Sequence, residues 1–302
     1  MATLESAHDA TLERERMLVL GAALLTVTLW ASAFVGIRSA GRDLSPGALA
    51  LGRLLVASVA LGALAFVRRE ALPSKRDLPG IALFGVLWFG VYSVVLNQAE
   101  RSVDAGTAAM LVNVGPILIA VLAGILLHEG FPRGLLAGCL IAFAGAVVIG
   151  IATSEHGLVP SWGAVLCVVA AVAYAGGVVT QKPLLARMTP LQVTWVGCTA
   201  GALACLPFAG SLWHDASDAR ASAIGWTIYL GIVPTAIGFI AWAYALSRTT
   251  AGRMGSTTYL VTPIAILLGW LLLGETPPEL ALLGGALCLA GVAVARRVQK
   301  PA

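Results

Sequence analysis

The chain has 302 residues, of which 59% are hydrophobic and 11% are charged, and its mean hydropathy is +0.90. Soluble domains are roughly half apolar and about one quarter charged, so the composition excludes an ordinary soluble protein and predicts a chain that resides in a lipid bilayer. The formal net charge of +4 is modest and gives no support for nucleic-acid binding.

Ten apolar runs predict the fold class, which is an all-α polytopic membrane protein with ten transmembrane helices. An α-helix needs about 20 apolar residues to cross a hydrocarbon core of roughly 30 Å. The runs are continuous and lack the period-two alternation of a membrane barrel. They lie near residues 17–37, 47–67, 80–98, 105–127, 134–152, 161–181, 190–209, 223–246, 253–273 and 279–295.

An internal repeat with a period of 146 residues predicts the domain organisation. The shift places Glu129 on Glu275 and Gly138 on Gly284. Each copy opens with small residues, carries a proline part-way along an apolar run, and ends in a second apolar helix. The expected units are a tail at residues 1–16, a five-helix unit at residues 17–152 and a second five-helix unit at residues 161–297.

Five crossings are an odd number, so the second unit would enter the membrane from the opposite side and the repeat would be inverted. Inverted repeats with a site near the midplane are a recurring plan of secondary transporters. Most of the 19 Lys and Arg residues lie in connections that are cytoplasmic if the N-terminus is cytoplasmic. The positive-inside rule therefore predicts that both termini are cytoplasmic.

The first three predicted helices carry aromatic residues and one charge. Trp30 and Phe34 lie about one turn apart in the first helix, and Trp88 and Tyr92 share a face of the third. Arg53, in the second, is the only Lys or Arg inside any predicted span. A charge there costs at least about 2.5 kcal/mol, so Arg53 must pair, face a wet cavity or extend to the membrane surface. Extension to the surface is as well supported as a functional role.

Prolines interrupt the fourth and ninth predicted helices near mid-membrane. Asn113 lies three residues before Pro116, and Tyr259 lies four residues before Pro263. A proline has no N–H and leaves a carbonyl of the preceding turn without its helical donor. Such breaks are tolerated at membrane depth where protein, side chains or water satisfy the freed groups. The two breaks predict a symmetric binding position, with a kink that only shapes packing as the alternative.

Glutamates and glycines mark the ends of each unit. We interpret Glu129 and Glu275 as helix caps and not as proton carriers, because each stands at a turn before a helix with proline in its first turn. Glycines seven residues apart suit close contact between helices. These are Gly138 and Gly145 in the first copy and Gly284 and Gly291 in the second. The five cysteines show no metal-ligand or disulfide spacing, so no metal site is expected.

The paired motifs resemble the EamA family of the drug/metabolite transporter superfamily. They are residues 104–129, followed by the glycine-spaced helix, and their echo at 251–275. Residues 29–34 and 52–55 also resemble the first two helices of that family. The resemblance covers residues 17–297.

The resemblance implies ten helices in two inverted repeats, a bacterial-type inner membrane, no cofactor, and export of small metabolites such as amino acids. It also implies a central cavity built by the first, third, fourth, sixth, eighth and ninth helices. The sixth helix departs from the family in carrying Ala173 and Tyr174 where a tryptophan is common. The substrate-binding residues would be Trp30, Phe34, Trp88, Tyr92, Asn113, Tyr174, Trp242 and Tyr259, with Pro116 and Pro263 as helix breaks at a gate.

The main functional hypothesis is a secondary carrier that exports amino acids or similar amphipathic metabolites. An exporter of cationic drugs on the same fold is the alternative. The expected cavity is nearly uncharged and suits neutral or zwitterionic cargo. No Asp or Glu lies well inside a predicted span, which favours facilitated diffusion or exchange over proton antiport.

Two other classes have little support. An intramembrane enzyme would need a motif such as HExxH or GxSxG, and neither is present. A sensor would need a domain outside the membrane, and the longest expected loop, 210–222, is about a dozen residues. The expected partners are the small-molecule cargo and the bilayer. A monomer is compatible with this arrangement, and the sequence does not fix the oligomeric state.

Overall fold

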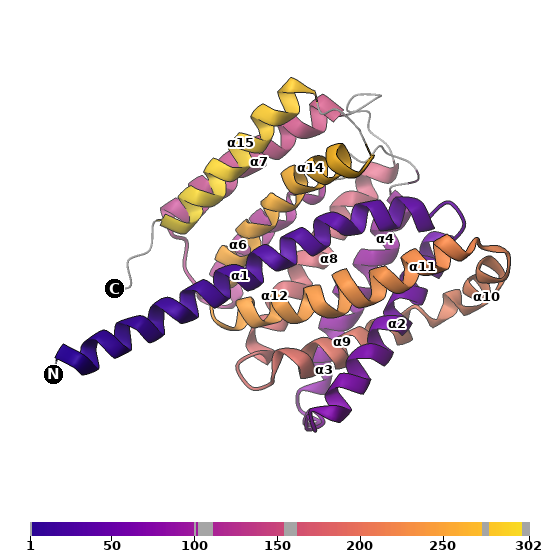
Figure 1. Ribbon diagram of the computed structural model, residues 1–302, viewed down its shortest axis with the longest axis horizontal. Helices are drawn as coiled ribbons and strands as arrows, with labels where there is room; N and C mark the ends of the chain where they lie inside the picture. The colour runs from indigo at the N-terminus through magenta and orange to yellow at the C-terminus, as the bar shows by residue number, and fades with distance from the viewer. Residues whose placement is uncertain (1, 100, 102–110, 154–161, 274–277, 298–302) are drawn as a thin grey trace.

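The computed structural model describes residues 2–99, 101, 111–153, 162–273 and 278–297. These residues form helices and short connections, with no β-strand among them, and pack into one bundle (Figure 1). The predicted all-α fold class is therefore correct. Within the described residues, seven helices are long and apolar enough to cross a membrane, or eight if one bent pair counts as a span. This count does not confirm ten crossings, and one predicted span begins at residue 105, outside the described residues.

The helical elements follow one another through short connections. In the first part of the chain they are α1 (Ala2–Ala40), α2 (Pro46–Val67), α3 (Leu78–Phe84), η1 (Gly85–Tyr92), α4 (Ser93–Ala99), α6 (Gly115–Leu126) and α7 (Arg133–Thr153). In the second part they are α8 (Trp162–Leu184), α9 (Pro190–Ala204), η2 (Leu206–Phe208), α10 (Ala209–Asp218), α11 (Ala221–Leu230), η3 (Gly231–Ile237), α12 (Gly238–Ser247), α13 (Ala251–Thr257), η4 (Thr258–Leu260), α14 (Val261–Leu273) and α15 (Glu279–Arg297).

Helix α1 begins at Ala2 and so includes most of the segment 1–16 that we expected as a tail. In Figure 1 its first turns extend beyond the bundle. Residues 2–20 contain no glycine or proline and are rich in Ala, Leu, Glu and Arg, which are good helix formers. This stretch therefore contains no residue that interrupts a helix, and α1 extends back to Ala2.

Two membrane helices contain a π-helical segment at equivalent positions of the repeat. η1 begins at Gly85 and η3 at Gly231, which is a shift of 146 residues. Within η3, Pro234 has no N–H to donate to the carbonyl of Leu230, and the hydroxyl of Thr235 donates to that carbonyl at 2.7 Å. π-Helical turns are rare and frequently occur at functional sites. The sequence analysis did not predict them.

The seventh helix is shorter than predicted. We expected a span to residue 209, but α9 ends at Ala204, and Pro207 lies in the short helix η2 that follows. The chain bends by 53° before α10, because proline cannot donate the hydrogen bond that would continue α9. The expected loop at residues 210–222 is consequently helical over most of its length.

Two contacts attach the end of α10 and the residues after it to the turn between α1 and α2. The carboxylate of Asp215 accepts the backbone N–H of Ser45 at 2.8 Å, and the guanidinium of Arg220 binds Asp43 through both carboxylate oxygens at 2.8 and 2.9 Å. The hydrogen bonds from Arg220 lower the pKa of Asp43. This stabilisation is therefore present above the ordinary pKa of an aspartate and is lost as the pH falls through the lowered value.

Helices α7 and α15 pack side by side at a contact built from four glycines (Figure 1). A Cβ atom added to Gly138 would lie 2.6 Å from the carbonyl oxygen of Gly291, and one added to Gly145 would lie 2.5 Å from that of Gly284. The numbers rise along one helix as they fall along the other, so the helices are antiparallel. The predicted role of these glycines in close helix contact is confirmed.

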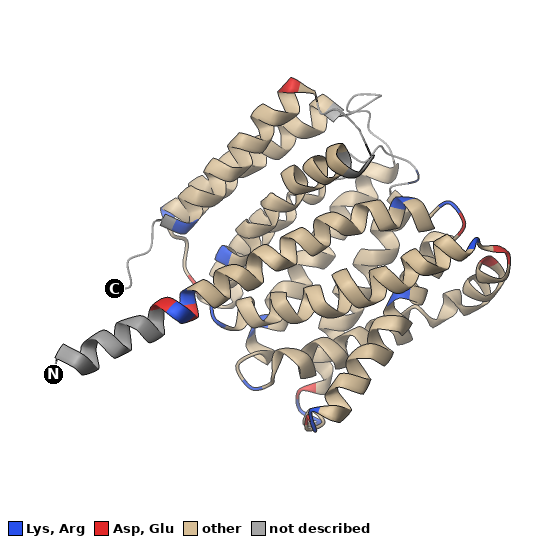
Figure 2. Ribbon diagram, in the orientation of Figure 1, with Lys and Arg blue, Asp and Glu red and all other residues tan. Residues whose placement is uncertain are grey.

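The outer surface of the bundle is apolar between its ends. Large side chains such as Val59, Phe66, Leu140 and Leu283 are more than half exposed. Charged residues lie mainly at the ends of helices and in the connections (Figure 2). A protein surrounded by lipid at its middle has this distribution, because charges are costly there and apolar side chains are not.

We expect Gly291→Val to destabilise the protein, because the new side chain would occupy space held by backbone atoms of Gly138 and Ala142. Overpacking of a close contact costs about 1–3 kcal/mol. The thermal unfolding midpoint of the purified protein in detergent measures the effect. Gly225→Val is the matched control, since a Cβ atom there meets nothing within 4 Å. Equal midpoints for the two variants would contradict this view of the contact.

Candidate functional site

A cavity lies inside the bundle, between helices that come from both parts of the chain. Its volume is about 130 Å³, which is room for several water molecules or a small metabolite. It is lined by Trp30, Ala33, Phe34, Ile37, Arg53, Trp88, Tyr92, Ser93, Leu96, Asn97, Val112, Asn113, Pro116, Tyr174, Pro234, Thr235, Phe239, Thr258, Val261 and Thr262.

Four interruptions inside membrane helices supply residues to this lining, whereas η2, between α9 and α10, supplies none. The π-helix η1 supplies Trp88, and η3 supplies Pro234. The turn before α6 supplies Asn113, and the 3-10 helix η4 supplies Thr258. Irregular backbone in a membrane is tolerated where it lines a cavity or is buried in protein, so the four interruptions and the cavity belong to one feature.

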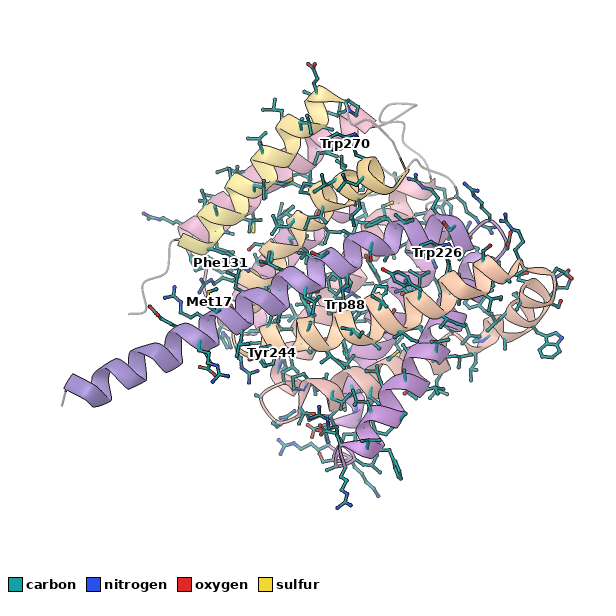
Figure 3. All side chains as sticks on the ribbon, viewed as in Figure 1. Met17, Trp88, Phe131, Trp226, Tyr244 and Trp270 are labelled. Atoms are coloured by element: carbon teal, nitrogen blue, oxygen red, sulfur yellow. The ribbon has the colours of Figure 1, made fainter. Side chains whose placement is uncertain are left out.

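Aromatic rings form one wall of the cavity and meet around Trp88, near the middle of the bundle (Figure 3). The Trp88 ring centroid lies 5.9 Å from that of Trp30, 5.1 Å from Tyr174, 5.0 Å from Phe239 and 5.4 Å from Trp242. Most of these pairs are tilted or edge-to-face, which is the favoured geometry for aromatic pairs. We call these five rings the ring cluster; four of them line the cavity, and Trp242 does not.

Two hydrogen bonds place polar groups of both repeat units on the cavity surface. The Asn113 amide donates to the hydroxyl of Thr262 at 3.0 Å. The Tyr174 hydroxyl donates to that of Thr258 at 3.2 Å. Both threonines lie next to or within the interrupted part of the helix that runs from α13 to α14. The cavity thus presents amide and hydroxyl groups opposite aromatic faces, a combination that can orient an amphipathic ligand.

Arg53 lines the cavity as well, and its Nη2 atom lies 3.4 Å from the hydroxyl oxygen of Ser93. The expectation of a nearly uncharged cavity is therefore wrong for this wall. Sequence reasoning left the choice between the membrane surface and a wet cavity open, because it could not tell which face of α2 points inward.

The predicted site residues fall into two groups. Most of them lie together on the cavity surface, whereas Trp242, Tyr259 and Pro263 are not part of the lining. Trp242 is fully buried and stacks against Trp30 with ring centroids 5.0 Å apart. The lining members are Trp30, Phe34, Trp88, Tyr92, Asn113, Tyr174 and Pro116.

Tyr259 points away from the cavity. It is fully buried in a core cluster with residues of α7 and α15, among them Cys139 and Cys288. The lining residues of its helix are Thr258, Val261 and Thr262, which share one face at helical spacing. Tyr259 is about 120° around the 3-10 helix η4 from Thr258, and this rotation turns its ring towards the neighbouring core.

Hydrogen bonds of buried and partly buried side chains lie between the ring cluster and the turn that joins α12 to α13. The Trp242 indole N–H donates to the side-chain oxygen of Gln181 at 3.0 Å. The ammonium of Lys182 donates to the carbonyls of Leu246 and Thr249, both at 2.7 Å. The last carbonyls of a helix have no helical donor, and a cation is a favourable partner for them.

Glu129 binds the same turn where it leads into α13. Its carboxylate oxygens accept the backbone N–H groups of Ala251 at 2.7 Å and Gly252 at 3.1 Å. Glu129 is thus a helix cap, as predicted, but it caps α13 and not the helix that follows it in the chain. Left-handed backbone at His128 and Gly130 forms the turn around it.

Lys182, Glu129 and the turn that they hold, residues 246–252, are called the clamp below. In Figure 3 Tyr244 and Phe131 mark this end of the bundle, near Met17, while Trp226 lies towards the opposite end. The cavity lining includes no residue of the clamp. Glu275, the counterpart of Glu129 in the repeat, lies outside the described residues.

The described part of the chain offers no group of three or more His, Cys, Asp or Glu residues that could hold a metal ion. All five cysteines are buried thiols. What the site can do is to enclose a small amphipathic molecule. Apolar helices around a cavity, interrupted where they line it, define the class of secondary transporters.

Comparison with known proteins is consistent with that class. The model of the EamA-like transporter family matches residues 17–151 and again residues 161–297. The chain therefore belongs to the EamA-like transporter family. It is a multi-pass membrane transporter and not an enzyme.

Three curated relatives and one solved structure are similar over most of their length. A probable terminal-alkyne amino-acid exporter of Streptantibioticus cattleyicolor is 40% identical, with 91% of this chain and 92% of that protein covered. The uncharacterized transporter YdfC of Bacillus subtilis is 33% identical, with 89% and 87% covered. A probable amino-acid metabolite efflux pump of Salmonella typhimurium is 26% identical, with 89% and 92% covered. A crystal structure of another protein shares the fold, with a TM-score of 0.76 at 19% identity over 93% of this chain and 96% of that one.

We expect Glu129→Gln to loosen the clamp, because the amide has one acceptor oxygen for the two N–H groups and no charge. A hydrogen bond to a charged group contributes about 1.5–3 kcal/mol. Amide hydrogen exchange at Ala251 and Gly252 should therefore become roughly 10- to 100-fold faster. Glu15→Gln, which removes a contact at 3.9 Å to Arg248, is the control. Unchanged exchange in Glu129→Gln would contradict the clamp.

Proposed function

We propose that the protein exports amino acids or related small amphipathic metabolites across a bacterial-type inner membrane by alternating access. The observation that carries the proposal is the cavity, which combines the ring cluster with amide and hydroxyl groups inside a family scaffold of transporters. The relatives named as an amino-acid exporter and an amino-acid metabolite efflux pump support the same class of cargo.

The architecture that we propose has ten membrane helices in two inverted five-helix units, at residues 17–152 and 161–297, after the segment 1–16. Two features support it. The shift of 146 residues exchanges the contact between Gly138 and Gly291 with that between Gly284 and Gly145. It also places η1 on η3. Two antiparallel units related by a pseudo-two-fold axis would produce both correspondences.

We propose further that both termini are cytoplasmic, following the distribution of Lys and Arg. In that orientation the clamp lies at the cytoplasmic end, and the cavity lies towards the external end, where Ile37 and Asn97 line it. The conformation would then be one with the cytoplasmic side closed. Release of the clamp would be the step that opens the cavity inward.

The cargo would contact the lining members of the predicted site, with its apolar part against the rings and its polar part at Asn113 and Thr262. Trp242 would join the site only after a rearrangement, because it is fully buried below Trp30. A direct role for Tyr259 would need a rotation of its helix. Pro116 and Pro263 would keep the two interrupted helices able to bend.

The test is uptake of radiolabelled amino acids by purified protein in liposomes, with empty liposomes as the control. Saturable uptake would support the proposal. Uptake of a cationic dye without uptake of any amino acid would favour the drug exporter, and uptake of neither would contradict the proposal.

Asn113→Ala should lower amino acid uptake roughly three- to tenfold, because one hydrogen-bonding group contributes about 1 kcal/mol. Gln98→Ala is the matched control, since Gln98 is an exposed amide outside the lining. The initial rates are compared at equal amounts of reconstituted protein. Equal rates in the two variants would remove Asn113 from the site.

Transport should proceed without an imposed pH gradient, because the described lining contains no Asp or Glu that could carry a proton. The measurement is counterflow of labelled amino acid in liposomes with the same pH inside and outside. Addition of a protonophore is the control and should leave the rate unchanged. Uptake that requires a pH gradient would contradict this expectation.

A further inference from the structure

Arg53 is the one charged residue among the described side chains that line the cavity. It is partly exposed and belongs to α2. Its contact with Ser93, at 3.4 Å, is with another lining residue. The remainder of the lining is aromatic, aliphatic, hydroxyl or amide in character. The cavity wall therefore carries a positive group opposite an otherwise neutral surface.

A charge at membrane depth is costly, and such residues are rare unless they serve a site. Arg53 lies within the apolar helix α2, seven residues after its first residue, Pro46, and it lines the cavity and contacts Ser93 there. A leucine or methionine would fill the same volume without that cost. The position therefore points to a use for the charge that packing alone does not explain.

The guanidinium group has the geometry to recognise a carboxylate. It presents five N–H donors in a planar fork, and two of them can bind both oxygens of one carboxylate. The contact of Nη2 with Ser93 lies on the cavity wall, so the guanidinium reaches the space that a ligand would occupy. The low polarity around the cavity would strengthen the attraction relative to bulk water.

We propose that Arg53 binds the carboxylate of the cargo and so makes the transporter selective for amphipathic carboxylates. The inference rests on the proposed export of amino acids and names the residue that recognises their common group. The apolar part of the cargo packs on Trp30, Trp88 and Tyr92. An amine that lacks a carboxylate meets a like charge at Arg53 and binds less well, which argues against cationic drugs as the principal cargo.

The experiment compares two probes that share one side chain. The affinities of L-phenylalanine and L-phenylalaninamide are measured on the full-length protein in detergent by titration calorimetry. The wild type should bind phenylalanine roughly 10- to 100-fold more tightly than the amide, the range expected for hydrogen bonds to a charged group. Equal affinities in the wild type would overturn the proposal without any variant.

Arg53→Gln keeps a polar side chain, although a shorter one, and removes the charge. It should lose the preference for phenylalanine while retaining affinity for the amide, which also shows that the variant is folded. Arg42→Gln is the matched control, because Arg42 is exposed and lies outside the lining. A wild-type preference in Arg53→Gln would overturn the proposal.

If Arg53→Gln binds neither probe, Arg53→Lys is the variant that tests the proposal. Lysine keeps the charge but not the fork, so the preference should fall between that of the wild type and unity, with amide binding unchanged. A full wild-type preference in Arg53→Lys would count against bidentate recognition. If the wild type carries no amino acid in liposomes, the proposed function is contradicted. If it carries amino acids but its selectivity does not depend on Arg53, only this inference is contradicted.

Discussion

A membrane-embedded backbone must satisfy its own hydrogen bonds, because lipid offers no donors or acceptors. In this protein the helices obey that constraint along most of their length and depart from it at η1, η2, η3, η4 and the turn at Asn113. All of these departures except η2 line the cavity. Where η3 frees the Leu230 carbonyl, the hydroxyl of Thr235 replaces the missing donor. The irregular backbone and the cavity therefore depend on each other.

The same constraint explains why the two ends of the interior differ. Towards the cavity, neutral side chains bond to one another: Asn113 donates to Thr262, and Thr258 accepts from Tyr174. Towards the clamp, the free helix ends are satisfied by side chains, with Lys182 on the carbonyls of α12 and Glu129 on the N–H groups of α13. Charged side chains bound to helix ends are strong but reversible contacts. They suit a closure that must be broken and remade in each transport cycle.

The two parts of the chain that match the family model differ in the side chains that they turn inward. Asn113 and Tyr259 occupy equivalent positions, yet one lines the cavity and the other packs against Cys139 and Cys288. The prolines of the two copies are one residue out of register. One residue corresponds to about 100° of helix rotation, which is enough to move a side chain from a cavity face to a packing face.

Predictions from the sequence are most successful where a pattern has only one physical interpretation. Apolar runs of membrane length require helices, and the glycines of α7 and α15 were correctly assigned to close contact. They are less successful where the outcome depends on rotation about a helix axis. Because of the rotation of their helices, Arg53 faces the cavity and Tyr259 does not. The π-helices were missed because a π-helix changes a hydrogen-bond pattern, for which Pro234 was the only local signal.

If the protein works by alternating access, the clamp, which would close one end of the cavity, must open for transport. Spin labels at Phe131 and Arg248, both exposed near the clamp, report on that end, and labels at Arg42 and Trp270 report on the other. Distances measured by pulsed electron resonance in liposomes, with and without saturating amino acid, give the answer. We expect cargo to lengthen the distance between the labels at Phe131 and Arg248 in part of the population, and to shorten the distance between those at Arg42 and Trp270. A clamp distance that stays unchanged during active transport would contradict this expectation.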